Sequence, residues 1–89
     1  MGWQIDFGDA AKKDLARLDK PIARRIVAFL RERVATLKDP RTLGEALKGS
    51  KFGSFWKYRV GDYRIVCSIE DSVLRILAVR IGSRRDVYR

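Results

Sequence analysis

The chain has 89 residues, of which 46% are hydrophobic and 35% are charged. This composition is typical of a globular protein rather than a disordered one, and the length leaves too little interior for two cores. We therefore expect one domain over residues 1–89. Lysine and arginine number 20 against 11 aspartate and glutamate, which gives a formal net charge of +9. A polyanion, such as nucleic acid or an acidic protein segment, is the first partner to consider.

Several kinds of chemistry lack the residues that they need. The sequence contains no histidine, so no imidazole can act as acid, base or metal ligand. Cys67 is the only cysteine, which excludes an internal disulfide and a zinc cluster and fits a reducing cytoplasm. The longest apolar run, Ile26 to Leu30, is far shorter than the roughly 20 residues of a membrane-spanning helix. Because no secretory pattern opens the chain, we expect a soluble cytoplasmic protein with no cofactor, no metal and no membrane partner.

The first half of the chain predicts one strand and two helices. Apolar and polar residues alternate over residues 1–7, which is typical of a strand. Asp9 is a suitable N-cap for a helix to about Leu18, and Pro21 suits the first turn of a second helix that Asp39-Pro40 ends. The second helix has the strongest apolar stripe in the chain: Ile22, Ile26, Phe29, Leu30, Val34 and Leu37. Basic residues on these helices are predicted to be ordinary solvent-exposed charges: Lys12, Lys13, Arg24 and Arg25.

The second half predicts most of a sheet. Three glycines and scattered polar residues predict a loop over residues 41–54. Period-two alternation then predicts three strands joined by turns at Gly61-Asp62 and Asp71-Ser72: Phe55–Val60, Tyr63–Glu70 and Val73–Ile81. The last strand is apolar on both faces, as expected in the middle of a sheet, and we place it beside the first strand. The sequence therefore predicts an α+β fold, strand–helix–helix–three antiparallel strands, with the helices on one face of a four-stranded, mostly antiparallel sheet.

The Gly61-Asp62 turn determines which side chains share a face of the predicted hairpin. A two-residue turn pairs Arg59 with Arg64, and alternation then places Lys57, Arg59 and Arg64 on one face. The other face is the predicted core face: Trp56, Tyr58, Val60, Tyr63, Ile65, Cys67 and Ile69. Opposed arginines repel across a hairpin, so this arrangement does not help folding. An anionic partner is the simplest reason for it.

The last predicted strand should end beside this hairpin and bring a basic tail with it. The tail contains Arg84, Arg85, Tyr88 and Arg89. Guanidinium groups bind phosphate through two hydrogen bonds, and a phenol ring can stack on a base. We therefore favour a polyanion-binding face over the alternative that these charges only aid solubility.

Two segments also carry a resemblance to a known family. The runs WKYRVGDYRIV (residues 56–66) and VRIGSRRDVY (residues 79–88), together with the element order, closely resemble the RelE toxins of the RelE/ParE superfamily. Members are the toxin half of bacterial and archaeal toxin–antitoxin pairs, and the RelE branch cuts messenger RNA in the ribosomal A site. The resemblance implies a metal-independent, ribosome-dependent endoribonuclease that a cognate antitoxin wraps and holds inactive.

The resemblance implies catalytic positions as well. Lys57 matches a catalytic lysine of the family, and Arg59 stands where the best-known relatives have a second lysine. Arg64 matches the arginine just after the hairpin turn. Arg84 matches the arginine after the final glycine, and Tyr88 matches the C-terminal tyrosine. These five residues include the three that alternation places on one face, so the two arguments agree.

The chemistry of RNA cleavage suggests a role for each position. Guanidinium neighbours favour the neutral form of an amine, so Lys57 is the candidate general base for the 2′-hydroxyl. Arg64 and Arg84 would clamp the phosphate, and Arg59, which stays protonated, would stabilise charge. Tyr88 would stack on or orient the nucleotide. The predicted RNA-binding residues are Lys57, Arg59, Arg64, Arg84, Arg85 and Arg89.

Two alternatives remain open at this stage. A ParE-like inhibitor of DNA gyrase would share the fold, although such toxins generally do not keep the five catalytic positions together. A module that binds RNA or the antitoxin without cutting is the other alternative. Ser83 stands where many relatives carry a histidine or a lysine, so a helper acid of some relatives is absent.

Overall fold

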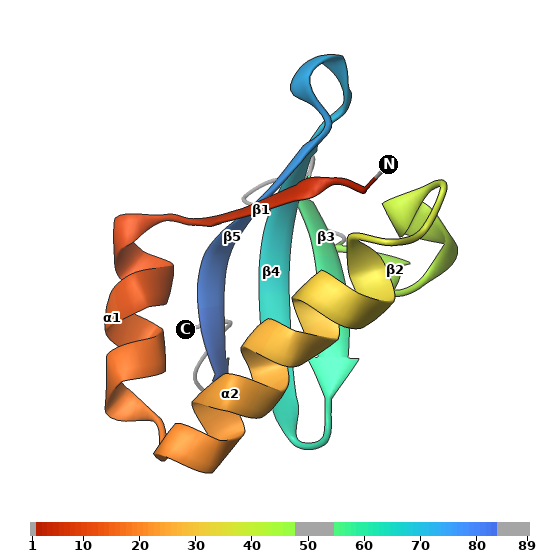
Figure 1. Ribbon diagram of the computed structural model, residues 1–89. Helices are drawn as coiled ribbons and strands as arrows, with labels where there is room; N and C mark the ends of the chain where they lie inside the picture. Colours follow the sequence, from red (N-terminus) through yellow and green to blue (C-terminus); the bar gives the residue numbers. More distant parts are fainter. Residues whose placement is uncertain (1, 48–54, 84–89) are drawn as a thin grey trace.

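The sheet has five strands in the order β1-β5-β4-β3-β2 in the computed structural model, which describes residues 2–47 and 55–83. They are β1 (Gln4–Phe7), β2 (Glu45–Ala46), β3 (Phe55–Val60), β4 (Tyr63–Glu70) and β5 (Arg75–Ser83). β1 is parallel to β5, and the other neighbouring pairs are antiparallel. The helices α1 (Asp9–Arg17) and α2 (Lys20–Ala28) pack on one face of the sheet (Figure 1).

The predicted α+β fold is confirmed, including the first strand beside the last one. The predicted count of four strands is wrong, because β2 adds a fifth within the segment predicted as a loop. β2 pairs Glu45 with Lys57 and Ala46 with Trp56. Two residues are too few to show a period-two pattern in the sequence.

The helix boundaries differ from the prediction at the start of the first helix and at the end of the second. The N-cap of α1 is Gly8, and Asp9 lies in the first turn, where its carboxylate interacts favourably with the helix dipole. α2 begins at Lys20 with Pro21 in its first turn, as the prediction requires. It continues as a π-helix, η1 (Phe29–Val34), and ends before Asp39. The carbonyl of Ala35 accepts a hydrogen bond from the Trp3 amide at 2.8 Å, so tertiary contact replaces the next helical hydrogen bond.

The main core lies between the helices and the sheet. Its fully buried members from the second helix are Ile26, Leu30 and Val34, and they pack against Ile65 and Ile76 of the sheet. The other strand residues predicted for this face are buried or half-buried: Trp56, Tyr58, Val60, Tyr63, Cys67 and Ile69. The predicted alternation of the hairpin is therefore confirmed.

The two turns of the sheet differ in how well the sequence predicts them. Gly61 takes a positive φ of 59° in the Gly61-Asp62 turn, as expected of a tight hairpin. The predicted Asp71-Ser72 turn is longer: Asp71–Val73 form a 3-10 turn (η4), and Leu74 has a left-handed φ of 50°. β5 therefore begins at Arg75 and not at Val73, because the 3-10 turn and Leu74 occupy the preceding residues.

We call the side of the sheet opposite α1 and α2 the outer face. A smaller apolar cluster lies on it, in which Leu47 and Val66 are buried against Phe55 and Val79. β5 is thus apolar on both sides, as predicted for a strand inside the sheet. Its ladder to β4 shifts register between Val66 and Cys67, which marks a β-bulge. Among the described residues, no helix is long and apolar enough to cross a membrane.

Candidate nucleic-acid interface

The hairpin of β3 and β4 carries basic side chains on the outer face. Its register pairs Arg59 with Arg64 and Lys57 with Val66. The alternate pair, Tyr58 and Ile65, is buried on the helix side. Lys57, Arg59 and Arg64, which we call the outer-face cluster, therefore lie together as alternation predicts.

Arg64 is buried in this cluster. Only 7% of the residue is exposed, and its guanidinium donates to the neighbouring carbonyl of Tyr63 at 3.5 Å. Within residues 2–47 and 55–83, no carboxylate lies within 4.0 Å of Arg59 or Arg64. Burying a guanidinium without a counter-charge costs free energy. A bound anion would supply that counter-charge.

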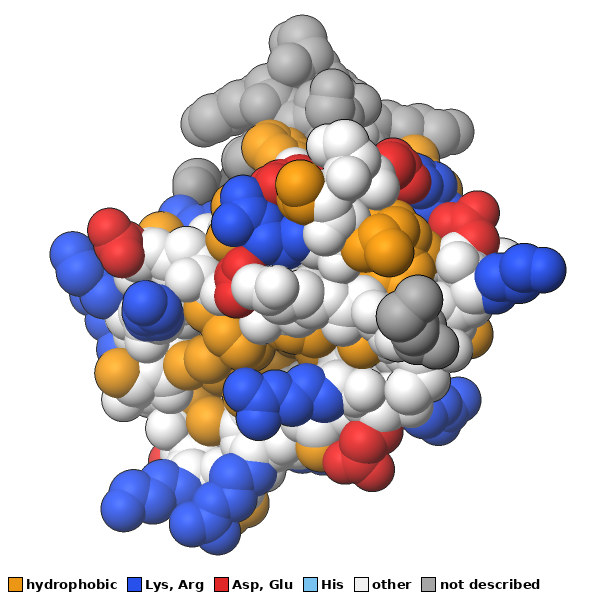
Figure 2. All heavy atoms as spheres, turned by 45° about the horizontal axis from the view of Figure 1, so that its top comes forward, with side chains coloured by type: hydrophobic (Ala, Val, Ile, Leu, Met, Phe, Trp, Pro, Cys, Tyr) orange, Lys and Arg blue, Asp and Glu red, His pale blue; other side chains and the backbone are white. Residues whose placement is uncertain are grey.

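Positive charge by itself does not locate a binding surface on this molecule. Figure 2 shows lysine and arginine side chains spread around the rim of one face, with carboxylates beside some of them. Several arginines are paired in this way: Arg41 with Asp71, Arg75 with Glu70, and Arg80 with Asp14. The outer-face cluster differs from the rest of the basic surface in that one of its arginines, Arg64, is buried although no carboxylate of the described residues pairs with it.

Glu45 lies beside this cluster, and sequence reasoning missed it. Its carboxylate is 4.0 Å from the Lys57 ammonium, across the short ladder of β2 and β3. The side chain of Glu45 is 73% exposed, so the pair is accessible from outside. A carboxylate can accept a proton, which makes Glu45 a second candidate for acid–base chemistry. Nothing in the glycine-rich segment indicated it, because the two-residue strand has no readable period.

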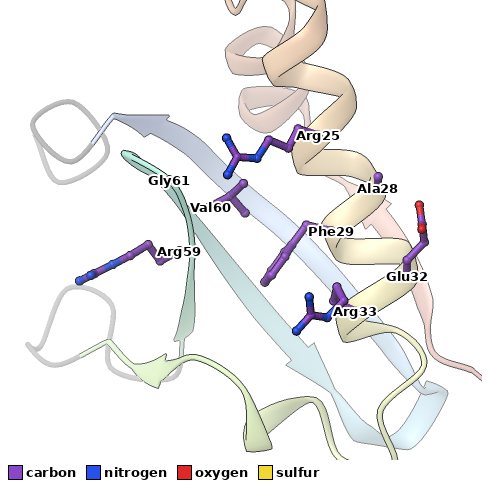
Figure 3. Close-up of a pocket in the computed structure, with 8 residues that line it drawn as sticks. All are labelled: Arg25, Ala28, Phe29, Glu32, Arg33, Arg59, Val60 and Gly61. Atoms are coloured by element: carbon purple, nitrogen blue, oxygen red, sulfur yellow. The ribbon is translucent and has the colours of Figure 1, made fainter.

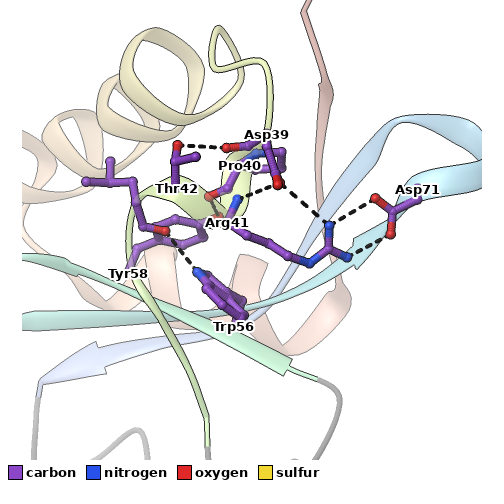
Figure 4. Close-up of polar contacts among 8 residues, drawn as sticks. Asp39, Pro40, Arg41, Thr42, Trp56, Tyr58 and Asp71 are labelled. Carbon is purple, nitrogen blue, oxygen red and sulfur yellow. Dashed lines mark hydrogen bonds and ion pairs between the residues drawn. The ribbon is translucent and has the colours of Figure 1, made fainter.

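Two aromatic side chains, the buried Tyr58 and the half-buried Trp56, hold the segment that leads to Glu45. The Trp56 indole donates to the carbonyl of Leu43 at 2.9 Å, and the Tyr58 hydroxyl donates to the carbonyl of Pro40 at 2.8 Å (Figure 4). Both residues belong to β3, so the strand that carries Lys57 also fixes the approach to β2. The predicted packing role of these aromatic residues is confirmed.

Gly44 is required at the point where this segment meets the cluster. Its φ is +84°, in the left-handed region that favours glycine. A Cβ there would lie 2.5 Å from the carbonyl oxygen of Lys57 and 2.8 Å from the Tyr58 ring. The backbone of the segment therefore approaches β3 more closely than any other residue would permit.

The space between these groups is small. A pocket of about 40 Å³ is lined by Gly44, Glu45, Lys57, Tyr58, Arg59 and Arg64. Since a single ordered water needs roughly 10–15 Å³, the pocket has room for a few waters or for an oxygen atom of a phosphate, but not for a nucleotide. A nucleic acid would lie across the surface with a phosphate pointing into this pocket.

The end of β5 is fixed next to the hairpin. Gly82 pairs with Arg64, and Ser83 pairs with Tyr63. The buried Asp14 carboxylate accepts from the Arg80 guanidinium at 3.0 Å and from the Ile81 amide at 2.8 Å. The prediction that the last strand ends beside the hairpin is confirmed. The predicted residues of the tail lie outside the described residues: Arg84, Arg85, Tyr88 and Arg89.

Two other reactive groups of the hairpin, the Cys67 thiol and the Tyr58 hydroxyl, are unsuited to catalysis. Burial raises the pKa of the Cys67 thiol, which is fully buried. Burial also raises the pKa of the Tyr58 hydroxyl, which is already engaged with Pro40. Neither group therefore supplies a nucleophile or an acid–base catalyst at neutral pH.

Comparison with known proteins places this arrangement among toxins. The family described as "ParE toxin of type II toxin-antitoxin system, parDE" matches residues 5–88. The toxin RelE of Mycobacterium tuberculosis is 35% identical over 87 residues, which are 98% of this chain and 87% of that protein. The toxin RelG of the same organism is 28% identical over 89 residues, which are 100% of this chain and 99% of that protein.

Solved structures share the fold at lower sequence identity. The toxin–antitoxin complex RelBE2 of Mycobacterium tuberculosis contains a chain that matches with a TM-score of 0.84 at 23% identity, covering 97% of this chain and 95% of that chain. The isolated RelE toxin of E. coli matches with a TM-score of 0.70 at 20% identity, covering 97% and 90% of the two chains. These likenesses confirm the fold.

Proposed function

Since this chain belongs to the ParE toxin family of type II toxin–antitoxin systems, within the RelE/ParE superfamily, we propose that it is a RelE-like endoribonuclease that cuts messenger RNA in the ribosomal A site. The observation that supports this proposal most directly is the outer-face cluster. Its two arginines lie opposite each other without a neighbouring carboxylate among the described residues, and one of them is buried. Such a cluster suits a scissile phosphate, whose negative charge increases in the transition state.

The proposed reaction needs no metal. A base takes the proton of the RNA 2′-hydroxyl, and the oxygen attacks the adjacent phosphorus. The bond from phosphorus to the 5′-oxygen then breaks, and that oxygen takes up a proton. The products are a 2′,3′-cyclic phosphate and a 5′-hydroxyl. In this scheme Arg64 holds the phosphate, and Arg59 stabilises charge at its edge.

The proton acceptor is assigned to Lys57, as the resemblance implies. Glu45, whose carboxylate is 4.0 Å away, keeps the Lys57 side chain directed toward the phosphate. Glu45 is also the second candidate for the acceptor, because its carboxylate faces the same small pocket. Arg84 and Tyr88 complete the proposed site as a second phosphate clamp and a nucleotide-orienting group, with Arg85 and Arg89 as further RNA contacts.

The proposed partners follow from the same assignment. The toxin would act in the cytoplasm on ribosomes and messenger RNA, and a cognate antitoxin would hold it inactive. We expect the antitoxin to cover the outer-face cluster or to displace Tyr88. A complex in which both stay free and the toxin stays active would contradict this expectation.

Mapping of messenger 5′ ends on purified translating ribosomes tests the activity. Wild-type protein is expected to produce cuts in phase with codons, and Arg64→Ala is expected to lose them and to relieve growth arrest in cells. Intact messenger in the presence of folded wild-type protein would overturn the proposal. Circular dichroism of both proteins serves as the control for folding.

A second candidate function is inhibition of DNA gyrase, since the matching family carries the ParE name. A gyrase inhibitor acts by binding a protein and has no need of a cluster of cationic side chains, one of them the buried Arg64, around a small pocket. The same preparation distinguishes the two candidates: intact messenger together with gyrase–DNA adducts would support the second one.

A further inference from the structure

A groove lies between the second helix and the edge of β3. It meets the outer-face cluster at Arg59, which lines both. Its volume is about 390 Å³, and its lining includes Arg25, Phe29, Arg33, Arg59, Val60 and Gly61. Figure 3 shows Arg25, Phe29 and Arg33 directed from the helix toward β3, whereas Arg59 points away from the helix. The groove is about ten times larger than the pocket beside Lys57, and its size suits part of an extended chain.

The π-helix explains why two arginines eight residues apart face the same groove. In an α-helix, four residues make slightly more than one turn, so Phe29 is rotated past Arg25 about the helix axis. A π-helix has more residues per turn, so four residues make slightly less than one turn. Arg33 is therefore rotated relative to Phe29 in the opposite direction. The two rotations about the helix axis largely cancel. Arg25, Phe29 and Arg33 therefore form one row along the groove, and π-helical turns of this kind are frequent at functional sites.

The arginines of the groove have no ion-pair partner among the described residues. In the described parts of the chain, no carboxylate lies within 4.0 Å of Arg25, Arg33 or Arg59, although Glu32 is also in the lining. The Arg25 guanidinium lies against the hairpin turn, with Nη1 3.5 Å from where a Cβ of Gly61 would be. The positive charge of the helix is therefore held close to the tip of the hairpin.

Arg59 connects this groove to the candidate site. It lines the groove, the small pocket beside Lys57, and a further hollow with Asp62 and Arg64. Cationic groups thus continue from the outer-face cluster, over the edge of β3, to the helix. A linear polyanion bound at Arg64 would meet Arg59 next and then Arg25 and Arg33.

We propose that this groove binds the sugar–phosphate backbone of the RNA strand adjoining the scissile phosphate, and that Arg25 and Arg33 are positioning residues for it. The proposal rests on the proposed function and extends its substrate site. Arg25 is exposed, as the sequence predicts, and the proposal gives this exposed charge a role in binding. Arg25 and Arg33 are about two helical turns apart, which is roughly 11 Å along the helix axis, so they would contact different phosphates. RNA is favoured over an acidic segment of the antitoxin because the groove is continuous with the cluster through Arg59.

Binding of a short fluorescein-labelled oligoribonucleotide of mixed sequence tests the proposal. Measurements use a Lys57→Met background, so that binding is separated from cleavage. Arg25→Ala and Arg33→Ala are each expected to weaken binding by roughly three- to tenfold. Between about 50 mM and about 200 mM salt, each change should lower the slope of log affinity against log salt by about 0.7.

Arg24→Ala is the matched control, because it removes the same charge from the same helix. Arg24 is exposed and lies outside the groove, beside Val27 and Arg31. It is expected to change both affinity and slope less than either groove variant. Equal effects of all three variants would overturn the proposal, since they would reflect net charge alone. An unchanged RNA affinity with weakened binding of the cognate antitoxin would also overturn it and assign the groove to the antitoxin.

Failure of the proposed function can be told from failure of this inference. If wild-type protein leaves messenger intact on ribosomes while Arg25→Ala and Arg33→Ala still weaken RNA binding, the groove stands and the nuclease assignment fails. If codon-phased cuts appear but the groove variants bind RNA like Arg24→Ala, the nuclease assignment stands and the groove proposal fails.

Discussion

The two ends of the outer face carry the same type of side chain in opposite electrostatic settings. Along β4, Arg64 and Glu70 lie on this face about 20 Å apart. At the Glu70 end, Arg75 donates to the Glu70 carboxylate at 2.7 Å and lies 3.5 Å from Asp6. At the other end, no carboxylate of the described residues lies within 4.0 Å of Arg59 or Arg64. The arginine at the Glu70 end is thus neutralised within the protein, whereas no carboxylate of the described residues neutralises the two arginines at the other end.

The burial of these arginines sharpens the difference. The side chain of Arg75 is 40% exposed although it is paired, whereas Arg64 is 7% exposed and has no carboxylate of the described residues within 4.0 Å. Stability alone would favour the reverse, because an unpaired charge is better tolerated in water. The ion pairs at the Glu70 end therefore contribute to the fold, whereas the burial of Arg64 is the feature that the proposed binding of a phosphate would account for.

The largest expected effect is at the pair of Lys57 and Glu45, which lies at the same end of the outer face as Arg64. Lys57→Met is expected to lower the rate of cleavage on programmed ribosomes by about 10²–10⁴, the usual effect of removing a general base. Glu45→Gln is expected to lower the rate of cleavage by about tenfold, because it removes only the group that directs the Lys57 side chain. Single-turnover rates as a function of pH measure both. An equal loss in the two variants, with the acid limb of the pH profile absent in Glu45→Gln, would move the acceptor to Glu45.

Arg64→Met tests the unpaired charge itself. It keeps an apolar stem of similar length and is expected to lower cleavage by about 10²–10³, as when one group that stabilises an oxyanion is lost. The free energy of unfolding should stay equal or rise, because the repulsion from Arg59 disappears. Urea titration measures the unfolding.

Arg75→Met is the matched control at the Glu70 end. It is expected to keep wild-type cleavage and to lose at most about 1 kcal/mol of stability, as for an exposed pair. Loss of cleavage in Arg75→Met comparable to that in Arg64→Met would remove the distinction between the two ends.

Asp14→Asn extends the comparison to a paired arginine at the end of β5. The buried carboxylate of Asp14 accepts from both Arg80 and Ile81. Replacing it by an amide keeps the shape but removes the charge, so the free energy of unfolding should fall by about 1–2 kcal/mol. Cleavage below the unfolding transition should not change. Urea unfolding gives the first quantity, and a stability equal to that of the wild type would show that this pair contributes nothing.

The smallest expected effect concerns the exposed pair of Arg41 and Asp71. The hydrogen bond from Arg41 lowers the pKa of the Asp71 carboxyl below its value in the unfolded chain. The pair therefore stabilises the fold above the unfolded pKa, and this contribution is lost as pH falls through the lower folded pKa. Urea midpoints of wild type and Asp71→Asn should differ slightly at neutral pH and converge in acid. A difference that persists or grows in acid would contradict this assignment.

Side-chain alternation by itself determined the most specific features of this protein. The Gly61-Asp62 turn and a period of two place Arg59 opposite Arg64 and direct Tyr58 and Ile65 inward, because register in a tight hairpin is a local property of the chain. The resemblance in residues 56–66 and 79–88 agrees with the toxin family that matches the chain. The roles of Lys57, Arg59, Arg64, Arg84 and Tyr88 remain proposals.

Only the tertiary structure decided what depends on segments that are distant in sequence. Glu45 reaches Lys57 because Trp56 and Tyr58 hold the carbonyls of Leu43 and Pro40, and no local pattern encodes those contacts. The groove exists because a π-helical turn aligns Arg25 and Arg33 opposite the edge of β3. An isolated segment reveals its own period, but which segments pack together follows from the burial of all of them at once.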